Sequence, residues 1–322
     1  MIVTLTLNPS LDRTMEITEL VRGDVIRATA VHLEPGGKGV NVSRALLANG
    51  VPSRAVLPCG GDDGAELVRL LVAAGVDVRA IPISGRTRSN ITIAEPDGTV
   101  TKINEPGPEL TADEVTGLID RALTEAGAGG CVVLCGSAPP GLPMTDLTAL
   151  YERVVAAGDR LVVDTSGPAL RAAAVAGADL VKPNRAEVAE VVGRPMRSLD
   201  DVVEAARELR SWGAGTVLAS LGPDGAVLVD DTGVLVGSAP VPRPRSSVGA
   251  GDALLAGFLT RWDAGPARGR DLAAAALAEG LAWGAAAVSL PGSRMPGPAD
   301  IRRDSVRLDT RPEDLRQLLT PN

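Results

Sequence analysis

The sequence predicts an α/β fold with a mostly parallel central sheet that is covered by helices on both faces. From about residue 40 to residue 290, short runs rich in β-branched residues alternate with Ala- and Leu-rich segments whose apolar residues recur every three or four positions. The short runs are apolar throughout, which is typical of strands buried between two helical layers. Two further segments, 12–34 and 86–105, break the alternation and predict a small second sheet.

The predicted strands of the central sheet follow one another along the chain: "AVLPCG" (55–60), "CVVLCG" (131–136), "LVVDTS" (161–166), "DLVKPN" (179–184) and "TVLASLG" (216–222). In sheets of this kind, ligands bind at the carboxyl ends of the strands. The polar residues at those ends are therefore candidates for a binding site: Ser137, Asp164, Lys182, Asn184 and Ser220.

Helices are predicted between these strands where the apolar spacing is regular, as in "AELVRLLVAAG" (65–75), "MTDLTALYERVVAAG" (144–158) and "SLDDVVEAARELRSWG" (198–213). Each segment ends in glycine, as many helices do. The third begins with Ser198 as a predicted N-cap, and Asp201 is placed as in a capping box. The last twenty residues, 303–322, predict a modest helix after a polar connection.

The two irregular segments alternate polar and β-branched residues with no helix between them. In the second segment, "EPDGTV" is typical of a hairpin turn, with Pro96 and Gly98 at the bend. Each segment is interpreted as an antiparallel ribbon with one apolar face. Together they predict a small sheet that stands off the main domain as a lid.

Charge and composition exclude several classes of partner. The net charge is −8 and aromatic residues make up 2% of the chain, so the basic face and the stacking platforms that nucleic-acid binding needs are both missing. We identify no signal peptide, and the apolar runs are short and interrupted, so we expect no membrane span and a cytoplasmic protein. The cysteines (Cys59, Cys131, Cys135) and the single His32 form no metal or disulfide pattern, and Cys131 and Cys135 are expected to be buried thiols.

The stretch "SSVGAGDALLAGF" (246–258) places a lone carboxylate, Asp252, at the start of a predicted buried helix. Asp252 either caps this helix or acts as a catalytic base. Gly249, Ala250 and Gly251 leave backbone N–H groups bare at the helix start, which suits an anion. A carboxylate beside an anion site repels the ligand unless it takes part in the reaction, so the stretch alone leaves both interpretations open.

The stretch "EPGGKGVNVSRALLANG" (34–50) is not a P-loop, because Lys38 is followed by Gly39 and Val40 rather than by a hydroxyl residue. No dinucleotide-binding glycine pattern follows the first strand either. A glycine-rich turn therefore enters a helix with Asn41 in its first turn. This turn either lets a polyol approach closely, with Asn41 hydrogen-bonding it, or is a tight strand-to-helix loop.

Two more carboxylates are candidate ligands. Asp12 closes "NPSLD" (8–12) at the end of the predicted first strand, where it either accepts two sugar hydroxyls or caps a turn. Asn184 and Glu187 lie three residues apart, on one face of a helix if a helix starts there. One carboxylate and one amide oxygen suit Mg²⁺, which keeps most of its water and takes few protein ligands.

Seven motifs occur here in the order seen in the phosphofructokinase-B-type sugar kinases of the ribokinase-like superfamily: "NPSLD", "PGGKGVN", "GRTRSN", "CGSAPPG", "KPN" followed by Glu187, "SLGPDGA" and "VGAGD". The chain resembles this family from Thr4 to about Gly297. The resemblance implies one three-layer α/β/α domain, residues 1–322, with a β-lid formed by about 12–34 and 86–105. In several relatives this lid also forms a dimer interface, so a homodimer through the lid is expected.

The resemblance also implies roles for individual residues. Asp252 resembles the base that takes the proton from the attacking hydroxyl, with an anion hole formed by Gly249, Ala250 and Gly251. The residues that resemble sugar ligands are Asp12, Gly37, Asn41 and Ser137. The residues that resemble ligands of the phosphate already on the sugar are Lys38, Arg88 and Lys102. The residues that resemble contacts of magnesium-ATP are Asn184 and Glu187, with Lys182 at a nucleotide phosphate. The residues that resemble the rest of the nucleotide pocket are Ser220, Gly222, Gly225 and Gly284.

The function that the resemblance implies is ATP- and Mg²⁺-dependent phosphorylation of a ketohexose monophosphate. The motifs "GGKGVN", "GRTRSN" and "KINEPGP" are most similar to those of 1-phosphofructokinases, which favours conversion of fructose 1-phosphate to fructose 1,6-bisphosphate. The alternatives are a tagatose-6-phosphate kinase, a 6-phosphofructokinase, a kinase of nucleosides or unphosphorylated sugars, and a non-catalytic regulator that binds sugar phosphates. Ser246 stands where many relatives have a potassium-binding Asp, so no potassium requirement is expected.

Overall fold

The computed structural model describes residues 1–262, 269–309 and 319–320. The strands of its main sheet are β1 (Ile2–Leu5), β4 (Ser53–Cys59), β5 (Val78–Pro82), β8 (Cys131–Cys135), β9 (Arg160–Asp164), β10 (Leu180–Val181), β11 (Thr216–Ser220), β12 (Ala226–Asp230), β13 (Gly233–Ser238) and β14 (Arg307–Asp309). In these residues the sheet has the order β14-β13-β12-β11-β10-β9-β8-β1-β4-β5. Pairing is parallel from β5 to β11 and antiparallel from β11 to β14, so the predicted mostly parallel sheet is confirmed.

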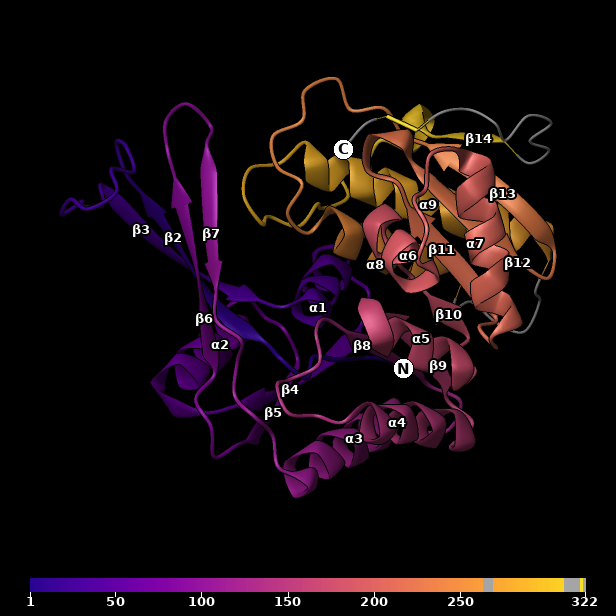
Figure 1. Ribbon diagram of the computed structural model, residues 1–322, viewed down its shortest axis with the longest axis horizontal. Helices are drawn as coiled ribbons and strands as arrows, with labels where there is room; N and C mark the ends of the chain where they lie inside the picture. The colour runs from indigo at the N-terminus through magenta and orange to yellow at the C-terminus, as the bar shows by residue number, and fades with distance from the viewer. Residues whose placement is uncertain (263–268, 310–318, 321–322) are drawn as a thin grey trace.

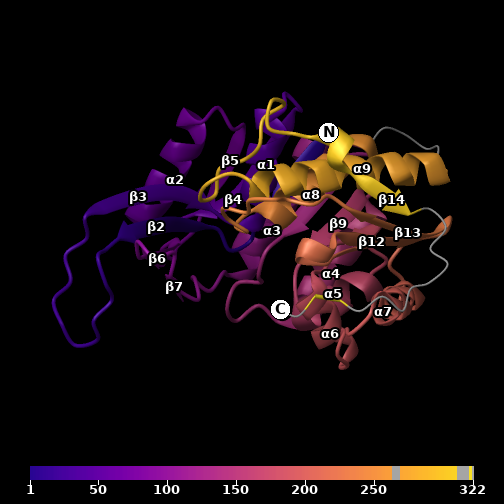
Figure 2. The ribbon, with the colours of Figure 1, turned by 90° about the horizontal axis from the view of Figure 1, so that it is seen from above.

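Helices cover both faces of this sheet, as Figure 2 shows from above. They are α1 (Lys38–Ala48), α2 (Gly61–Ala73), α3 (Ala112–Ala126), α4 (Met144–Ala156), α5 (Gly167–Val175), α6 (Arg185–Val192), α7 (Leu199–Ser211), α8 (Ala250–Trp262) and α9 (Arg270–Val288). Because side chains alternate along a strand, Val132 and Leu134 of β8 pack into the core with α3 to α7. Cys131, Val133 and Cys135 of the same strand pack into the core with α1, α8 and α9. The sheet is therefore the middle layer of three.

Local sequence signals account for where several helices begin. The capping box of α7 is present, because the Ser198 hydroxyl accepts from the backbone N–H of Asp201 and the Asp201 carboxylate accepts from that of Ser198. The helix predicted from Met144 begins at that residue as α4. Each of these helices turns its regularly spaced apolar residues toward the sheet.

One apolar segment, α9, is longer than the short, interrupted runs expected from the sequence. α9 is a continuous helix of 19 residues that is long and apolar enough, by length and composition, to cross a membrane. Its most apolar window is 61% buried inside the protein. Trp283 and Ala282 lie in the core that α9 shares with α8, which is how an apolar core helix packs.

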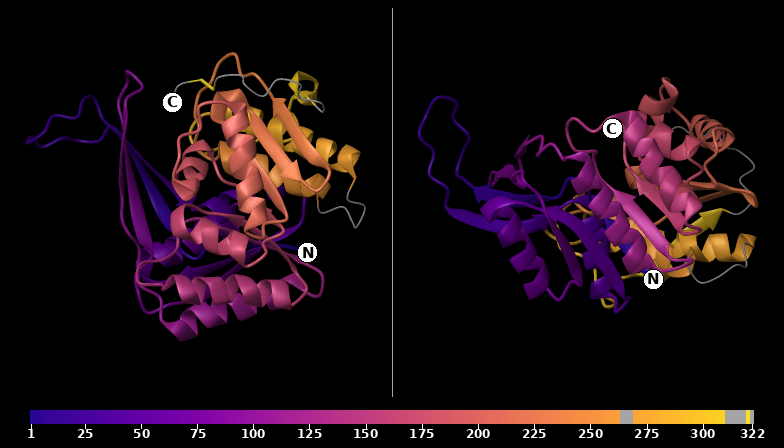
Figure 3. Two further views of the ribbon diagram at one scale, coloured as in Figure 1. Left: turned by 45° about the vertical axis from the view of Figure 1, so that its right-hand side comes forward. Right: turned by 90° about the horizontal axis from the view of Figure 1, so that it is seen from below.

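The two irregular segments form the predicted second sheet, which extends to one side of the main body (Figures 1 and 3). Its strands are β2 (Ser10–Glu16), β3 (Ala30–Gly36), β6 (Arg88–Ala94) and β7 (Val100–Asn104), in the order β3-β2-β6-β7. We call this sheet the lid sheet. The ribbons β2–β3 and β6–β7 are antiparallel as expected, but β2 and β6 join them in parallel.

Two further expectations need correction. Asp12 does not end the first strand, because β1 ends at Leu5 and Asp12 lies on β2 of the lid sheet. The helix expected over 303–322 is absent where the structure describes this range: a single 3₁₀ turn, η2 (Arg303–Ser305), precedes strand β14. β14 pairs with β13, whose edge offers free backbone groups to an extended segment. Residues 310–318 and 321–322 lie outside the described residues.

Candidate active site

The starts of α1 and α8 meet at the candidate site. Gly37 precedes α1 with φ of 122°, and Gly249 precedes α8 with φ of 75°, conformations that glycine adopts most readily. A Cβ atom on Gly249 would lie 2.6 Å from Cε of Met295, and a Cβ atom on Gly251 would lie 3.4 Å from Nζ of Lys182. The bare backbone at the start of α8 therefore lies beside a lysine, as an anion site requires.

Asp252 lies in the first turn of α8 and is almost fully buried, with 7% of its surface exposed. Its Oδ2 accepts a hydrogen bond of 2.9 Å from Nδ2 of Asn41 in α1. Burial and the nearby Asp164 raise the pKa of Asp252 to about 6, although the Asn41 hydrogen bond, Lys182 and Lys38 act in the opposite direction. A carboxyl group with such a pKa is ionised at pH 7 and still accepts a proton readily, which suits a general base.

Asp164, the last residue of β9, is fully buried and holds two lysines. Its Oδ1 lies 2.7 Å from Nζ of Lys38, and its Oδ2 lies 2.9 Å from Nζ of Lys182. Burial disfavours the charge of Asp164, but the two lysines hold its pKa below the usual value. Asp164 therefore fixes two positive charges beside the start of α8.

Glu187 and Asn184 form a capping box at the start of α6. The Asn184 side chain accepts from the backbone N–H of Glu187 at 3.0 Å, and Oε2 of Glu187 accepts from the backbone N–H of Asn184 at 2.7 Å. Oε1 of Glu187 also lies 3.2 Å from Nζ of Lys38. Lys38 is thus ion-paired with Asp164 and Glu187, beside the residues expected to contact the nucleotide.

The remaining predicted nucleotide positions end β11, follow it or lie on α9. Ser220 pairs with Asn184 through a parallel β-bridge, and Gly222 begins the 3₁₀ turn η1 (Gly222–Asp224). A side chain on Gly225 would collide with the carbonyl group of Gly237. Gly284 lies against α8, where a Cβ atom would be 3.2 Å from Cβ of Leu254. Packing alone explains why these last two positions are glycine.

On the lid side, Asp12 is fixed by its neighbours on β2 and β6. Its Oδ1 accepts from Oγ of Ser10 at 2.7 Å and from Nδ2 of Asn90 at 3.0 Å. A Cβ atom on Gly36 would collide with the Asp12 carboxylate. The bare Gly36 therefore leaves room for an oriented carboxylate next to the glycine-rich turn, as a ligand of sugar hydroxyls would need.

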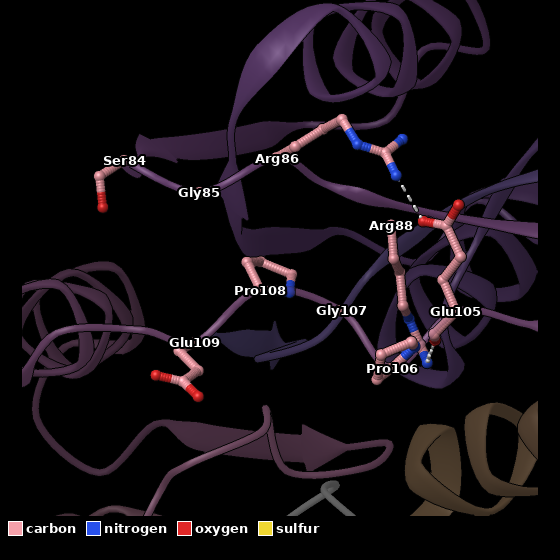
Figure 4. A pocket seen from close by; sticks show the side chains of 9 residues that line it. All are labelled: Ser84, Gly85, Arg86, Arg88, Glu105, Pro106, Gly107, Pro108 and Glu109. Carbon is pink, nitrogen blue, oxygen red and sulfur yellow. Dashed lines mark hydrogen bonds and ion pairs between the residues drawn. The ribbon is translucent and has the colours of Figure 1, made fainter.

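Arg88 lines a cavity of about 550 Å³ with residues 84–86 and 105–109 (Figure 4). Its Nη2 donates to the carbonyl oxygen of Asn8 at 2.9 Å and its Nη1 to that of Glu105 at 3.2 Å. The Asn8 side chain donates to Oγ of Ser137 at 3.3 Å. Arg88 and Ser137, which are 49 positions apart in the numbering, are thus brought together through Asn8.

Lys102 is exposed on β7, opposite Thr92 and two positions farther out along the lid sheet than the Asn90–Asn104 pair. Since side chains alternate along strands, Lys102, Asn90 and Asp12 share one face of the sheet.

Three supporting residues have contacts that the sequence-based prediction does not assign. Asp164 follows the strand-end rule, but its sequence position does not show that it would hold two lysines. Asn8 and Asn90 lie within "NPSLD" and "GRTRSN", yet their partners are distant in the sequence. Only the folded arrangement shows which side chains they orient.

Comparisons with known proteins identify the family. Residues 5–300 match the profile of the pfkB family carbohydrate kinases. The chain is 38% identical over 257 residues to ATP-dependent 6-phosphofructokinase isozyme 2 of Escherichia coli K12, covering 79% of this chain and 83% of that protein. It is 35% identical over 314 residues to 1-phosphofructokinase of Haloferax volcanii, covering 96% and 98%.

Solved structures show the same fold. The structure of phosphofructokinase-2 from Escherichia coli in complex with potassium aligns with a TM-score of 0.86 at 35% identity, over 93% of this chain and 96% of that one. Arabidopsis thaliana ribokinase complexed with ribose and ATP aligns with a TM-score of 0.72 at 22% identity, over 94% and 96%, which supports the ribokinase-like fold alone. The resemblance inferred from the seven motifs is confirmed, and the chain belongs to the pfkB family of carbohydrate kinases.

Proposed function

We propose that this kinase transfers the γ-phosphoryl group of ATP to a ketohexose monophosphate, with Asp252 as the base. The observation that carries the proposal is the position of Asp252 in the first turn of α8: it is buried, has a pKa of about 6 and accepts a hydrogen bond from Asn41. Asp252 takes the proton of the attacking sugar hydroxyl. The hydroxyl oxygen bonds to the γ-phosphorus while the bond between the γ-phosphorus and the bridging oxygen breaks, and ADP leaves with that oxygen. Backbone N–H groups at Gly249–Gly251 and the nearby Lys182 stabilise the charge on the transferred group.

Asn184 and Glu187 fit a magnesium ion that would accompany ATP. Their oxygens are already engaged in the capping box and with Lys38. They would therefore hold the ion through its own water molecules, which Mg²⁺ gives up reluctantly. When bound, the ion would neutralise the nucleotide phosphates beside Glu187.

The charge of Arg88 supports a substrate that is already phosphorylated. Among the described residues, its guanidinium group donates hydrogen bonds to two backbone carbonyl groups, whereas the neighbouring Arg86 forms ion pairs with Asp63 and Glu105. Burial lowers the pKa of Arg88, and Asp12 and Glu105 counter that effect only through space. An arginine that keeps its charge without a carboxylate in contact is suited to bind a phosphate.

Among the possible substrates we propose fructose 1-phosphate, phosphorylated at its 6-hydroxyl. The motifs "GGKGVN" and "GRTRSN" support this choice, and the similar proteins include both 1-phosphofructokinases and a 6-phosphofructokinase isozyme. A second candidate function, a non-catalytic sugar-phosphate regulator, is disfavoured because Asp252, Asn184 and Glu187 are all present.

An ADP-release assay tests the substrate. With saturating magnesium-ATP, we expect kcat/KM for fructose 1-phosphate to exceed that for tagatose 6-phosphate or fructose 6-phosphate at least tenfold, a difference of about 1.4 kcal/mol that one misplaced hydroxyl can supply. A higher value for either competing sugar would assign the substrate to that sugar instead. Turnover of none of them by a folded protein would overturn the kinase proposal.

We also propose a cytoplasmic homodimer joined through the lid sheet. Register pairs Met15 with Val31 and Ile91 with Ile103, which gives the sheet an apolar face, and Val31 and Ile103 are each more than half exposed. A second copy would cover this face. Light scattering should show a dimer at micromolar concentration and a monomer for Ile103→Glu; a wild-type monomer would contradict the proposal.

The free cysteines agree with the reducing compartment that we propose for this protein.

A further inference from the structure

We propose that Arg44 is a positioning residue that fixes the side-chain amide of Asn41 so that its nitrogen faces Asp252. Arg44 lies three residues after Asn41 on α1, on the same face of the helix. Its Nη1 donates to Oδ1 of Asn41 at 3.2 Å, and Nδ2 of Asn41 donates to Oδ2 of Asp252 at 2.9 Å. The inference rests on the proposed role of Asp252 as the base.

The two ends of an asparagine amide have nearly the same shape, so shape does not decide which end faces the base. Hydrogen-bonding capacity does decide it. Arginine can only donate, and an ionised carboxylate can only accept. Between Arg44 and ionised Asp252, Asn41 has a single consistent orientation, with oxygen toward Arg44 and nitrogen toward Asp252. In the flipped orientation the amide oxygen would face the carboxylate, which would disfavour ionisation of the base.

Other groups hold Arg44 in this place. The same Nη1 lies 3.5 Å from the carbonyl oxygen of Pro35 in β3 and 3.5 Å from Oγ of Ser293, which in turn donates to Glu34 at 2.9 Å. Burial lowers the pKa of Arg44, and the carboxylates of Glu34 and Asp12 oppose that shift. Arg44 is therefore held between the lid sheet, α1 and the segment that contains Ser293.

Arg44 acts on the base through Asn41. The groups that act on the ionisation of Asp252 include the charges of Asp164, Lys182 and Lys38 together with the Asn41 hydrogen bond. Removing Arg44 leaves those three charges in place, but it also removes one positive charge and the contacts of Arg44 with Pro35 and Ser293. A variant that lacks Asn41 loses the same charge and contacts when Arg44 is removed, so it separates a positioning role from a change in the net charge of the site.

The kinetic test uses Arg44→Met, which keeps the apolar stem and removes the donors. We expect kcat to fall about tenfold and the midpoint of the acid limb of the pH–kcat profile to rise by about one pH unit, with KM for magnesium-ATP within about twofold. In the Asn41→Ala background, adding Arg44→Met should change kcat less than about twofold. The matched control, Arg69→Met, removes an exposed arginine of α2 that pairs with Glu66 and should behave as wild type.

An equal loss of kcat in both backgrounds, or an unmoved acid limb, would overturn the inference. A measurement that does not depend on turnover tests the inference separately from the proposed function. In protein labelled with ¹⁵N-asparagine, the Asn41 amide signal, assigned by its absence in Asn41→Ala, should shift as Asp252 titrates, with a higher midpoint in Arg44→Met. If the wild type shows this titration but phosphorylates no sugar, the proposed function fails and the inference stands. If the midpoint is the same in both proteins, the inference fails.

Discussion

At the scale of single residues, the environment of Asp252 determines how kcat should depend on pH. Burial and Asp164 raise the pKa of Asp252 to about 6, and the base must be ionised to accept a proton. We therefore expect kcat to be constant above about pH 7 and to fall about tenfold per pH unit well below pH 6. The measurement is kcat against pH, with activity restored on return to pH 7.5 to exclude unfolding. A kcat that stays constant down to pH 5 would contradict the assignment.

The same raised pKa has a consequence for stability. Folded Asp252 holds its proton up to about pH 6, whereas an unperturbed Asp has a pKa of 3.8, so the folded state loses stability as the pH rises between these values. Asp252→Asn removes this cost, and we expect it to stabilise the protein at pH 7.5 by about 1–3 kcal/mol. Thermal unfolding at pH 4.5 and pH 7.5 checks the sign: the gain should be larger at pH 7.5. A variant less stable than wild type at pH 7.5 would contradict the account.

Residue-scale partners were the least predictable part of the site. The sequence marks Lys38 as a cation in a glycine-rich turn, and the family resemblance assigns it to the phosphate already on the sugar. The structure pairs Lys38 with Asp164 and Glu187, which are 126 and 149 positions away along the chain. No local pattern specifies such contacts, because they depend on how β9 and α6 are placed against α1.

At the scale of elements, α6 begins with residues that have two possible roles. Asn184 caps the helix, and we also propose it as a contact of magnesium-ATP. Serine is about as good an N-cap as asparagine, whereas alanine costs about 1 kcal/mol. We expect Asn184→Ser to keep the wild-type melting temperature and to raise KM for magnesium-ATP. Asn184→Ala should lower the melting temperature and also raise KM for magnesium-ATP. If Asn184→Ser leaves KM for ATP unchanged, the residue is a cap alone.

The lid sheet carries the proposed phosphate ligands on β6 and β7. We expect Arg88→Ala or Lys102→Ala to raise KM for the sugar phosphate about ten- to a hundredfold, as loss of a charge-assisted hydrogen bond of roughly 1.5–3 kcal/mol would do. KM for ATP should change far less. Arg69→Ala, on the surface of α2, is the control for loss of a positive charge. Equal effects on both substrates would place the two residues outside the sugar-phosphate site.

The lid sheet also shows which features of a structural element can be predicted from its sequence. Alternating polar and apolar residues with a proline-glycine turn predicted its ribbons, which the structure confirms. The parallel pairing of β2 with β6 was not predictable, because alternation has the same period in parallel and antiparallel strands. β14 was missed for a related reason: three residues are too few to show a period.

At the scale of the whole molecule, the sequence predicted the layers and the edge of the sheet at which the candidate side chains lie. Apolar strands alternating with helices require a covered, mostly parallel sheet, and such sheets place ligands at the carboxyl ends of their strands. Asp164 at the end of β9 and Asn184 after β10 follow this rule. Asn41 and Asp252, 211 positions apart, meet because α1 and α8 pack side by side on one face.

The central claim is that Asp252 takes the proton of the attacking hydroxyl. The most direct test is kcat of Asp252→Asn in the ADP-release assay, with the affinities for ATP and the sugar phosphate measured in the same preparation. We predict that both substrates still bind and that kcat falls by about 10²–10⁴-fold, the contribution expected of a general base. A variant that binds both substrates and keeps more than about a tenth of the wild-type kcat would contradict the claim.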